Sequence, residues 1–252
     1  PVGTDNVALG NYALSSGSLS GSYNTALGSA SLTSNTTGSQ NTAVGRDSAR
    51  ANTTGTANVA IGQSALASNT SGGSNIAVGE DSLYSNTTAS NNTAVGYQAG
   101  LNNTTGTQNT ALGRVAMRTY TTGNYNVSVG SVALYYNTTG SNNTALGTDA
   151  LNNNTTASNN TAVGYQAGKS NTTGTRNLAS GNLALYSNTT GDNDTALGSQ
   201  SLQANTTASD NTAVGYASLN VNTTGYGNVA VGKFALLSNT TASNNTAVGH
   251  AA

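Results

Sequence analysis

Side chains that could carry out chemistry are few in this sequence. Its 252 residues include 7 Lys or Arg, 8 Asp or Glu, 1 His and no Cys. The one histidine, His250, has no second His or Cys with which to bind a metal ion, and no internal His exists for a catalytic triad. We therefore expect no metal site, no cofactor and an exposed His250.

Paired carboxylates are the remaining route to catalysis, because glycoside hydrolysis needs two of them around one bond. Glu80 and Asp81 are adjacent in sequence, so in a strand their side chains would point to opposite faces. Asp47 lies two repeats before Asp81, a distance of roughly 10 Å if each repeat adds one strand spacing. We interpret these carboxylates as solvated surface charges and predict that the protein is not an enzyme.

Tyr and Arg, which anchor many interfaces and offer faces to sugar rings, are concentrated in one stretch of the chain. The candidate receptor or glycan contacts in this stretch are Arg114, Arg118, Tyr120, Tyr125, Tyr135 and Tyr136. The alternative is that these tyrosines cover apolar surface of a narrow molecule, with some reaching between chains. We favour the alternative, because no other feature singles out this stretch.

All of these residues belong to a repeat that runs along the whole chain. Its most constant element, Asn-Thr-Ala-Val-Gly, begins at Asn6, Asn24, Asn41, Asn58, Asn75, Asn92, Asn109, Asn126, Asn143, Asn160, Asn177, Asp194, Asn211, Asn228 and Asn245. The first step is 18 residues and every later step is 17. Such a repeat predicts units that pack only against their neighbours. We number the positions of the repeat from this Asn as columns 1 to 17.

The start of the repeat predicts a short strand. Column 2 is Thr or aliphatic, column 3 is Ala except at Ser128, column 4 is aliphatic except at Ser180, and column 5 is Gly. Alternate residues of a strand share a face, so we predict that columns 2 and 4 form the core. The small residues of columns 3 and 5 would then form a flat outer face that another chain approaches.

Columns 12 to 15 usually read Asn-Thr-Thr-Gly, which predicts a corner because Asn and Gly tolerate left-handed backbone. One repeat per coil makes the chain an all-β, parallel β-solenoid of about fifteen 17-residue coils, with a rise of ~4.8 Å per coil. We expect one solenoid domain over residues 1–252, with an atypical first coil at 1–23 and a truncated last coil at 245–252. Identical residues would stack into Asn ladders from columns 1 and 12 and Thr ladders from columns 13 and 14.

The repeat resembles those of two families of fibrous proteins. Asn-Thr-Ala-Leu-Gly-Thr-Asp-Ala-Leu at 143–151 resembles the repeat of trimeric autotransporter adhesin heads. Gly-Tyr-Gln-Ala-Gly at 96–100 and 164–168, followed by Asn-Thr-Thr-Gly, is similar to repeats of phage tail-fibre proteins. The adhesin resemblance implies a left-handed parallel β-roll with three chains around one axis. The period of 17 is longer than in those heads, so the cross-section of the coil should differ.

Both resemblances imply an extracellular structural or adhesive segment, the shaft or head of a phage tail fibre on the virion or of an adhesin on the bacterial cell surface. We expect a homotrimer that holds or presents a surface for a host glycan or protein receptor. The chain looks like a segment of a longer fibre, since it shows no membrane anchor, coiled-coil stalk or chaperone domain.

Composition excludes two other classes of partner. Charged residues are 6% and the net charge is -1, which argues against nucleic acid binding. No stretch approaches the ~20 apolar residues of a spanning helix, so this segment should not insert into a membrane. The alternative function is an ice-binding β-solenoid, in which the stacked Thr ladders would order water.

Overall fold

The computed structural model describes residues 3–252, which form short strands joined by turns. The chain divides into two compact units, Pro1–Tyr125 and Asn126–Ala252. The strands of the first unit are β1 (Val7–Leu9), β2 (Thr25–Leu27), β3 (Thr42–Val44), β4 (Val59–Ile61), β5 (Ile76–Val78), β6 (Thr93–Val95) and β7 (Thr110–Leu112). The strands of the second unit are β8 (Val127–Val129), β9 (Thr144–Leu146), β10 (Thr161–Val163), β11 (Leu178–Ser180), β12 (Thr195–Leu197), β13 (Thr212–Val214), β14 (Val229–Val231) and β15 (Thr246–Val248).

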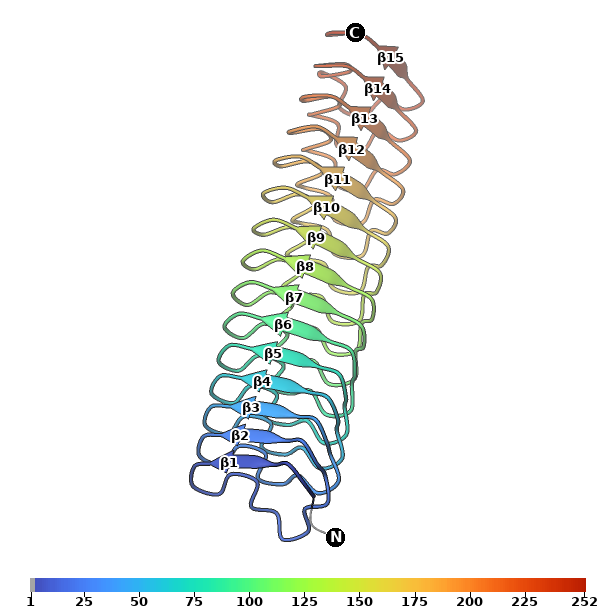
Figure 1. The fold of residues 1–252 in the computed structure, drawn as a ribbon. Helices are drawn as coiled ribbons and strands as arrows, with labels where there is room; N and C mark the ends of the chain where they lie inside the picture. The colour runs from blue at the N-terminus through green and yellow to red at the C-terminus, as the bar shows by residue number, and fades with distance from the viewer. Residues whose placement is uncertain (1–2) are drawn as a thin grey trace. The chain divides into compact units, whose positions relative to one another are not determined.

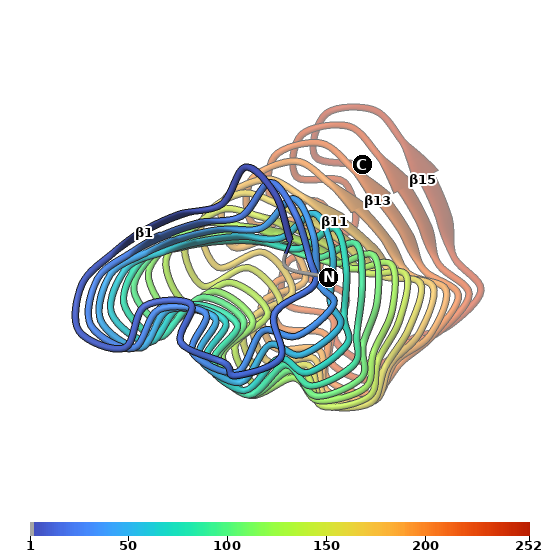
Figure 2. The ribbon, with the colours of Figure 1, turned by 60° about the horizontal axis from the view of Figure 1, so that its bottom comes forward.

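Within each unit, consecutive strands pair in parallel, so the coils follow one another as similar nested loops (Figures 1 and 2). The pairing is in register: Ala43 of β3 faces Ala60 of β4 in the first unit. In the second unit, Ala145 of β9 faces Ala162 of β10. The predicted all-β, parallel β-solenoid is therefore confirmed in each unit, with one repeat per coil. The handedness of the coils stays a prediction.

The strands present the opposite face to the core from the one that we predicted. In column 3, Ala60 and Ala162 are both 0% exposed. Their column-4 neighbours Ile61 and Val163 are 39% and 38% exposed. Alternation places columns 2 and 4 on the outside together, so the prediction that they form the core is wrong.

The width of the coil explains why alanine and not valine faces inward. A Cβ atom built on Gly168 in column 9 would lie 3.8 Å from the Cβ of Ala162 and 3.9 Å from that of Ala179. Column 9 therefore lies directly across the coil from column 3. In most coils column 9 holds a buried Leu, such as Leu185, and only a methyl group fits opposite it.

Column 5 is always Gly because the neighbouring coil of the same chain comes too close for any other residue. Gly45 has φ +128°, and a Cβ atom on it would lie 2.6 Å from the carbonyl oxygen of Gly62. We predicted that another chain approaches this small-residue face. The backbone that approaches it is instead the next coil of the solenoid.

The left-handed residues also lie elsewhere than predicted. They occupy columns 7, 9 and 17, for example Ser64 (φ 54°), Leu66 (φ 54°) and Ala57 (φ 57°). The column-15 glycines that the structure describes do not have positive φ, so the φ angle does not require glycine in the column that Ala89 shares. Left-handed backbone costs a non-glycine residue about 1–2 kcal/mol. Hydrogen bonds between coils offset this, such as the one from the Leu66 N–H to the Ser82 carbonyl at 2.9 Å.

The assignment of the core face can be tested with two substitutions at adjacent positions. Ala162→Val should lower the midpoint of thermal unfolding, because overpacking a filled core costs about 1–3 kcal/mol. Val163→Ala should change that midpoint little, because the Val163 side chain is 38% exposed. Circular dichroism during heating measures both. A larger loss for Val163→Ala than for Ala162→Val would restore the original prediction.

Candidate functional site

The first asparagine ladder, from column 1, runs through the interior of each unit. The side-chain oxygen of Asn41 accepts hydrogen bonds from the backbone N–H and the Nδ2 of Asn58, at 3.0 and 3.1 Å. The same Asn58 Nδ2 also donates to the Gly72 carbonyl at 2.8 Å. In the second unit, Asn143 contacts Asn126 in the same way, at 3.0 and 3.2 Å. The predicted ladder is confirmed, and its members from Asn24 to Asn228 are buried.

The second asparagine ladder, from column 12, meets the first at one carbonyl group. Asn69 Nδ2 donates to Asn52 Oδ1 at 2.8 Å and to the Gly72 carbonyl at 2.9 Å. The Thr hydroxyls behave differently from our prediction of a side-chain ladder. Thr53 Oγ1 donates to the backbone carbonyl of Thr70 at 2.9 Å, so column 13 bonds to the next coil's backbone. These ladders hold the coils together and present no reactive group.

Asp194 is the one column-1 residue that is not Asn. Its backbone N–H donates to Asn177 Oδ1 at 2.8 Å. Its carboxyl oxygens accept from the Asn211 N–H at 2.9 Å and from Asn205 Nδ2 at 3.0 Å. The carboxyl group cannot supply the two donated bonds of an amide. The Asn211 Nδ2, buried beside it, has no hydrogen-bond partner within the described residues.

Burial raises the pKa of Asp194 from its ordinary value of 3.8 to about 7. The hydrogen bond from the Asn211 N–H opposes this rise, and the negative charges of Asp210 and Asp192 add to it. Asp194 is 0% exposed, so no ligand reaches it in the folded chain. We interpret it as a weak point of the ladder. The departure was visible in the sequence, but its consequence depends on knowing that column 1 is buried.

Tyr120 is wrong as a receptor contact, because its side chain lies inside the first unit, 1% exposed. It takes the place of a column-12 Asn, and two glycines make room for the ring. Cβ atoms on Gly100 and Gly106 would lie 3.4 and 3.1 Å from ring carbons of Tyr120. Burial raises the pKa of the Tyr120 hydroxyl, and a hydrogen bond with the Asn109 side chain opposes that rise.

The other residues of the Tyr and Arg stretch are divided between the two units. In the first unit Arg114 and Tyr125 are exposed, and Arg118 Nε donates to Gln98 Oε1 at 3.0 Å. In the second unit Tyr135 and Tyr136 pack edge to face, with ring centroids 4.6 Å apart. The structure assembles no single site from these residues within either unit.

Two of the three carboxylates considered for catalysis have ordinary surroundings. Asp47 pairs with Arg46 at 3.4 Å and with Arg50 at 3.8 Å, and Glu80 is exposed. His250 is exposed, as predicted, and its ring lies 6.0 Å from that of Phe234.

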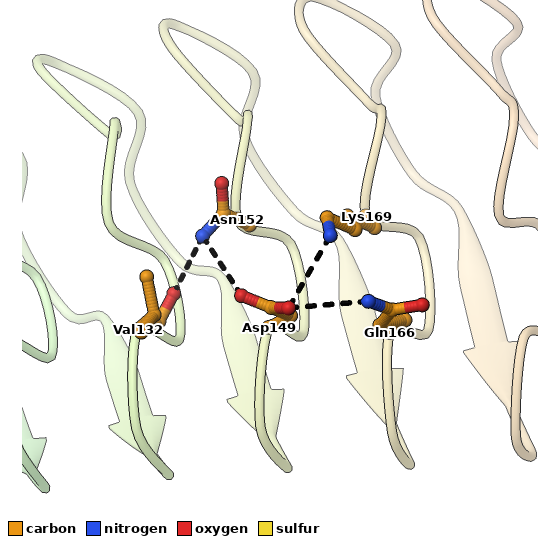
Figure 3. A network of polar contacts seen from close by, with 5 residues as sticks. All are labelled: Val132, Asp149, Asn152, Gln166 and Lys169. Carbon is orange, nitrogen blue, oxygen red and sulfur yellow. Dashed lines mark hydrogen bonds and ion pairs between the residues drawn. The ribbon is translucent and has the colours of Figure 1, made fainter.

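A surface network that sequence analysis missed lies in the second unit (Figure 3). Asp149 Oδ2 accepts hydrogen bonds from Gln166 Nε2 at 3.2 Å and from Lys169 Nζ at 3.3 Å, and Lys169 forms an ion pair with it. Asp149 Oδ1 accepts from Asn152 Nδ2 at 3.3 Å, and this amide also donates to the Val132 carbonyl at 3.0 Å. The sequence signal for this network is that Asp149 and Gln166 lie in column 7 of two successive repeats. Each carboxyl oxygen of Asp149 accepts at least one hydrogen bond from the protein's own groups.

Comparisons with known proteins identify no relative. A scan against models of known protein families found no match, and a search of curated proteins found no similar sequence. Among residues 3–252, no group of three or more His, Cys, Asp and Glu side chains is placed to hold a metal ion. The same residues contain no helix with the length and apolar character needed to cross a membrane.

The interpretation of Asp194 predicts how stability depends on pH. Between pH 3.8 and about 7 the folded chain keeps this proton while the unfolded chain releases it, so stability falls as pH rises through this window. Asp194→Asn should remove that fall and restore two donated hydrogen bonds. The unfolding midpoint of the variant should exceed that of the unmodified protein by more at pH 8 than at pH 4. The full difference corresponds to roughly 4 kcal/mol.

Glu80→Gln is the matched control, because Glu80 is exposed, loses the same charge and is not among the groups that shift the pKa of Asp194. We expect its unfolding midpoint to follow that of the unmodified protein across the pH range. A benefit of Asp194→Asn that does not change with pH would show that Asp194 titrates as an ordinary surface carboxyl group.

Proposed function

We propose that this chain is a structural or adhesive segment of an extracellular fibre, the shaft or head of a phage tail fibre or of a bacterial surface adhesin. In this proposal it forms a homotrimer of left-handed β-rolls that holds or presents a receptor-binding surface. The observation that supports it is an exposed apolar stripe on the strands of each unit, which we call the strand stripe. Its large apolar residues are Val7, Leu9, Leu27, Ile61, Ile76 and Val95 in the first unit and Val127, Val129, Val163, Leu178, Leu197 and Val248 in the second.

The strand stripe has the character of a surface that is covered in use. None of the strands from β1 to β15 contains a charged residue. Long uncharged strand faces promote aggregation unless another surface covers them. Exposed fractions are substantial even in the middle of each unit, for example 41% for Ile76 and 37% for Leu178. An apolar face of this kind is typical of an interface between subunits.

A second copy of this chain is the partner that matches the stripe. The stripe repeats at one strand spacing, ~4.8 Å, and a partner with the same rise can keep its side chains in step over many coils. Another copy of this chain has the same rise per coil because it has the same repeat. The contact surface changes from our first prediction: the Ala and Gly of columns 3 and 5 face the interior and the next coil, so columns 2 and 4 carry the contact.

The alternative, ice binding, has less support from the geometry. An ice-ordering surface needs parallel rows of free hydroxyl groups on a flat face. The column-13 hydroxyls, such as that of Thr70, donate to the backbone of the next coil. Column 14 alone provides a regular row of exposed Thr, as at Thr88 and Thr139.

The oligomeric state tests this proposal directly. Sedimentation equilibrium should give three times the chain mass of 24.9 kDa. Replacing Ile76 and Leu178 together with Lys should dissociate the trimer into folded monomers, because six positive charges would enter an apolar interface. Circular dichroism of the monomers should still show β-structure.

Thr88→Lys together with Thr139→Lys is the control, since both threonines are exposed and lie outside the strand stripe. This variant should remain trimeric. A stable monomer from the unmodified chain would overturn the trimeric model and make thermal hysteresis in freezing water the next assay.

A further inference from the structure

A small pocket lies on the surface of the first unit, between the coils of β5 and β6. Its volume is about 250 Å³, and it is lined by Asp81, Tyr84, Ser85, Gln98, Leu101 and Asn102. These residues occupy columns 7, 10 and 11 of two successive coils. The pocket is smaller than the ~300–1,000 Å³ of drug-sized ligand sites, which suits one ring and not a chain of them.

The Asp81 carboxylate has one oxygen that can still accept a hydrogen bond from a ligand. Gln98 Nε2 donates to Asp81 Oδ2 at 3.3 Å, and Gln98 Oε1 accepts from Arg118 Nε at 3.0 Å. Gln98 is thereby held from both sides. No described residue donates to Asp81 Oδ1 or forms an ion pair with Asp81.

The rest of the pocket offers one aromatic ring and several unused polar groups. Tyr84 is 38% exposed, so part of its ring is open to solvent. Within the described residues, the Tyr84 hydroxyl, the Ser85 hydroxyl and the Asn102 amide have no hydrogen-bond partner in the protein. An aromatic face beside a carboxylate and amides that can bond to hydroxyl groups suits a sugar ring.

The second unit contains the same pair of Asp and Gln side chains with different neighbours. There Asp149 and Gln166 replace Asp81 and Gln98, but Asn152 stands at the position of Tyr84 and Lys169 at that of Leu101. Both oxygens of Asp149 are occupied, by Asn152 on one side and by Gln166 and Lys169 on the other (Figure 3). Asn153 and Ser170 also replace Ser85 and Asn102, so four of the six lining positions differ between the two sites.

We propose that the pocket beside Tyr84 binds one ring of an uncharged sugar. The ring packs on Tyr84, two hydroxyl groups donate to the carboxylate of Asp81, and Asn102 and Ser85 bond to the remaining hydroxyls. An acidic sugar is disfavoured because Asp81 is the only charged side chain among the lining residues. The site lies within one chain, so the proposal goes beyond the proposed fibre function and stands without it.

Saturation-transfer NMR of the whole chain with methyl glycosides of glucose, galactose, mannose and N-acetylglucosamine tests the proposal. At least one glycoside should receive saturation from the protein. Tyr84→Ala should weaken its binding by about tenfold or more, because the ring supplies most of the contact area. Asp81→Asn should also weaken it, while both variants keep the thermal unfolding midpoint of the unmodified protein.

Asn152→Ala is the matched control at the equivalent position of the second unit, and it should leave binding unchanged. Asn152→Tyr combined with Asn153→Ser, Lys169→Leu and Ser170→Asn should recreate the pocket lining in the second unit and double the number of sugars bound per chain. No transfer to any of the four glycosides, or binding that survives Tyr84→Ala, would overturn the proposal. The oligomeric state is measured separately by sedimentation, so failure of the sugar site and failure of the trimer are distinguishable.

Discussion

One buried carbonyl group per coil, in column 15, determines how this solenoid is built. The Gly72 carbonyl accepts a hydrogen bond from each asparagine ladder, from Asn58 at 2.8 Å and from Asn69 at 2.9 Å. Without this carbonyl, one N–H of each amide would be buried without an acceptor, at a cost of about 1–3 kcal/mol each. Each amide also bonds to its counterpart one coil away. A constant period of 17 residues keeps both sets of bonds in register from coil to coil, and the 18-residue first step still keeps the column-1 bond between Asn24 and Asn6.

Because much of the interior is polar, little space remains there for large apolar side chains. The inward columns are filled by Asn, Ala, Ser and a single Leu, as at Asn58, Ala60 and Leu66. The larger aliphatic residues of the strands then face outward, where they are available to another molecule. Cohesion along the stack therefore comes from many equal contacts between neighbouring coils. The function of such a chain depends on its outer surface.

Much of the fold could be predicted from the sequence, because a repeat carries its own period, its strands and its stacked asparagines. The direction of the strand faces could not be read from alternation alone, which fixes that Ala162 and Val163 point apart but not which one points inward. The left-handed positions were missed for a related reason. Residues as different as Ser64 and Leu66 adopt them, since bonds between coils and not residue type impose the conformation. Tyr120 was misplaced because exposure at one position depends on the glycines of another coil.

A departure from the repeat can therefore be interpreted only when the structure shows whether its column is buried or exposed. Tyr120 and Asp194 both replace an interior Asn, and the structure adjusts to them with space from glycines in one case and a perturbed carboxyl group in the other. Neither reaches solvent. Tyr84 and Asn152 both occupy column 10, where Tyr84 is 38% exposed and Asn152 is 7% exposed, so one coil can open a pocket that another closes. Differences in binding between coils must therefore come from the exposed columns, because the buried ones reach no ligand.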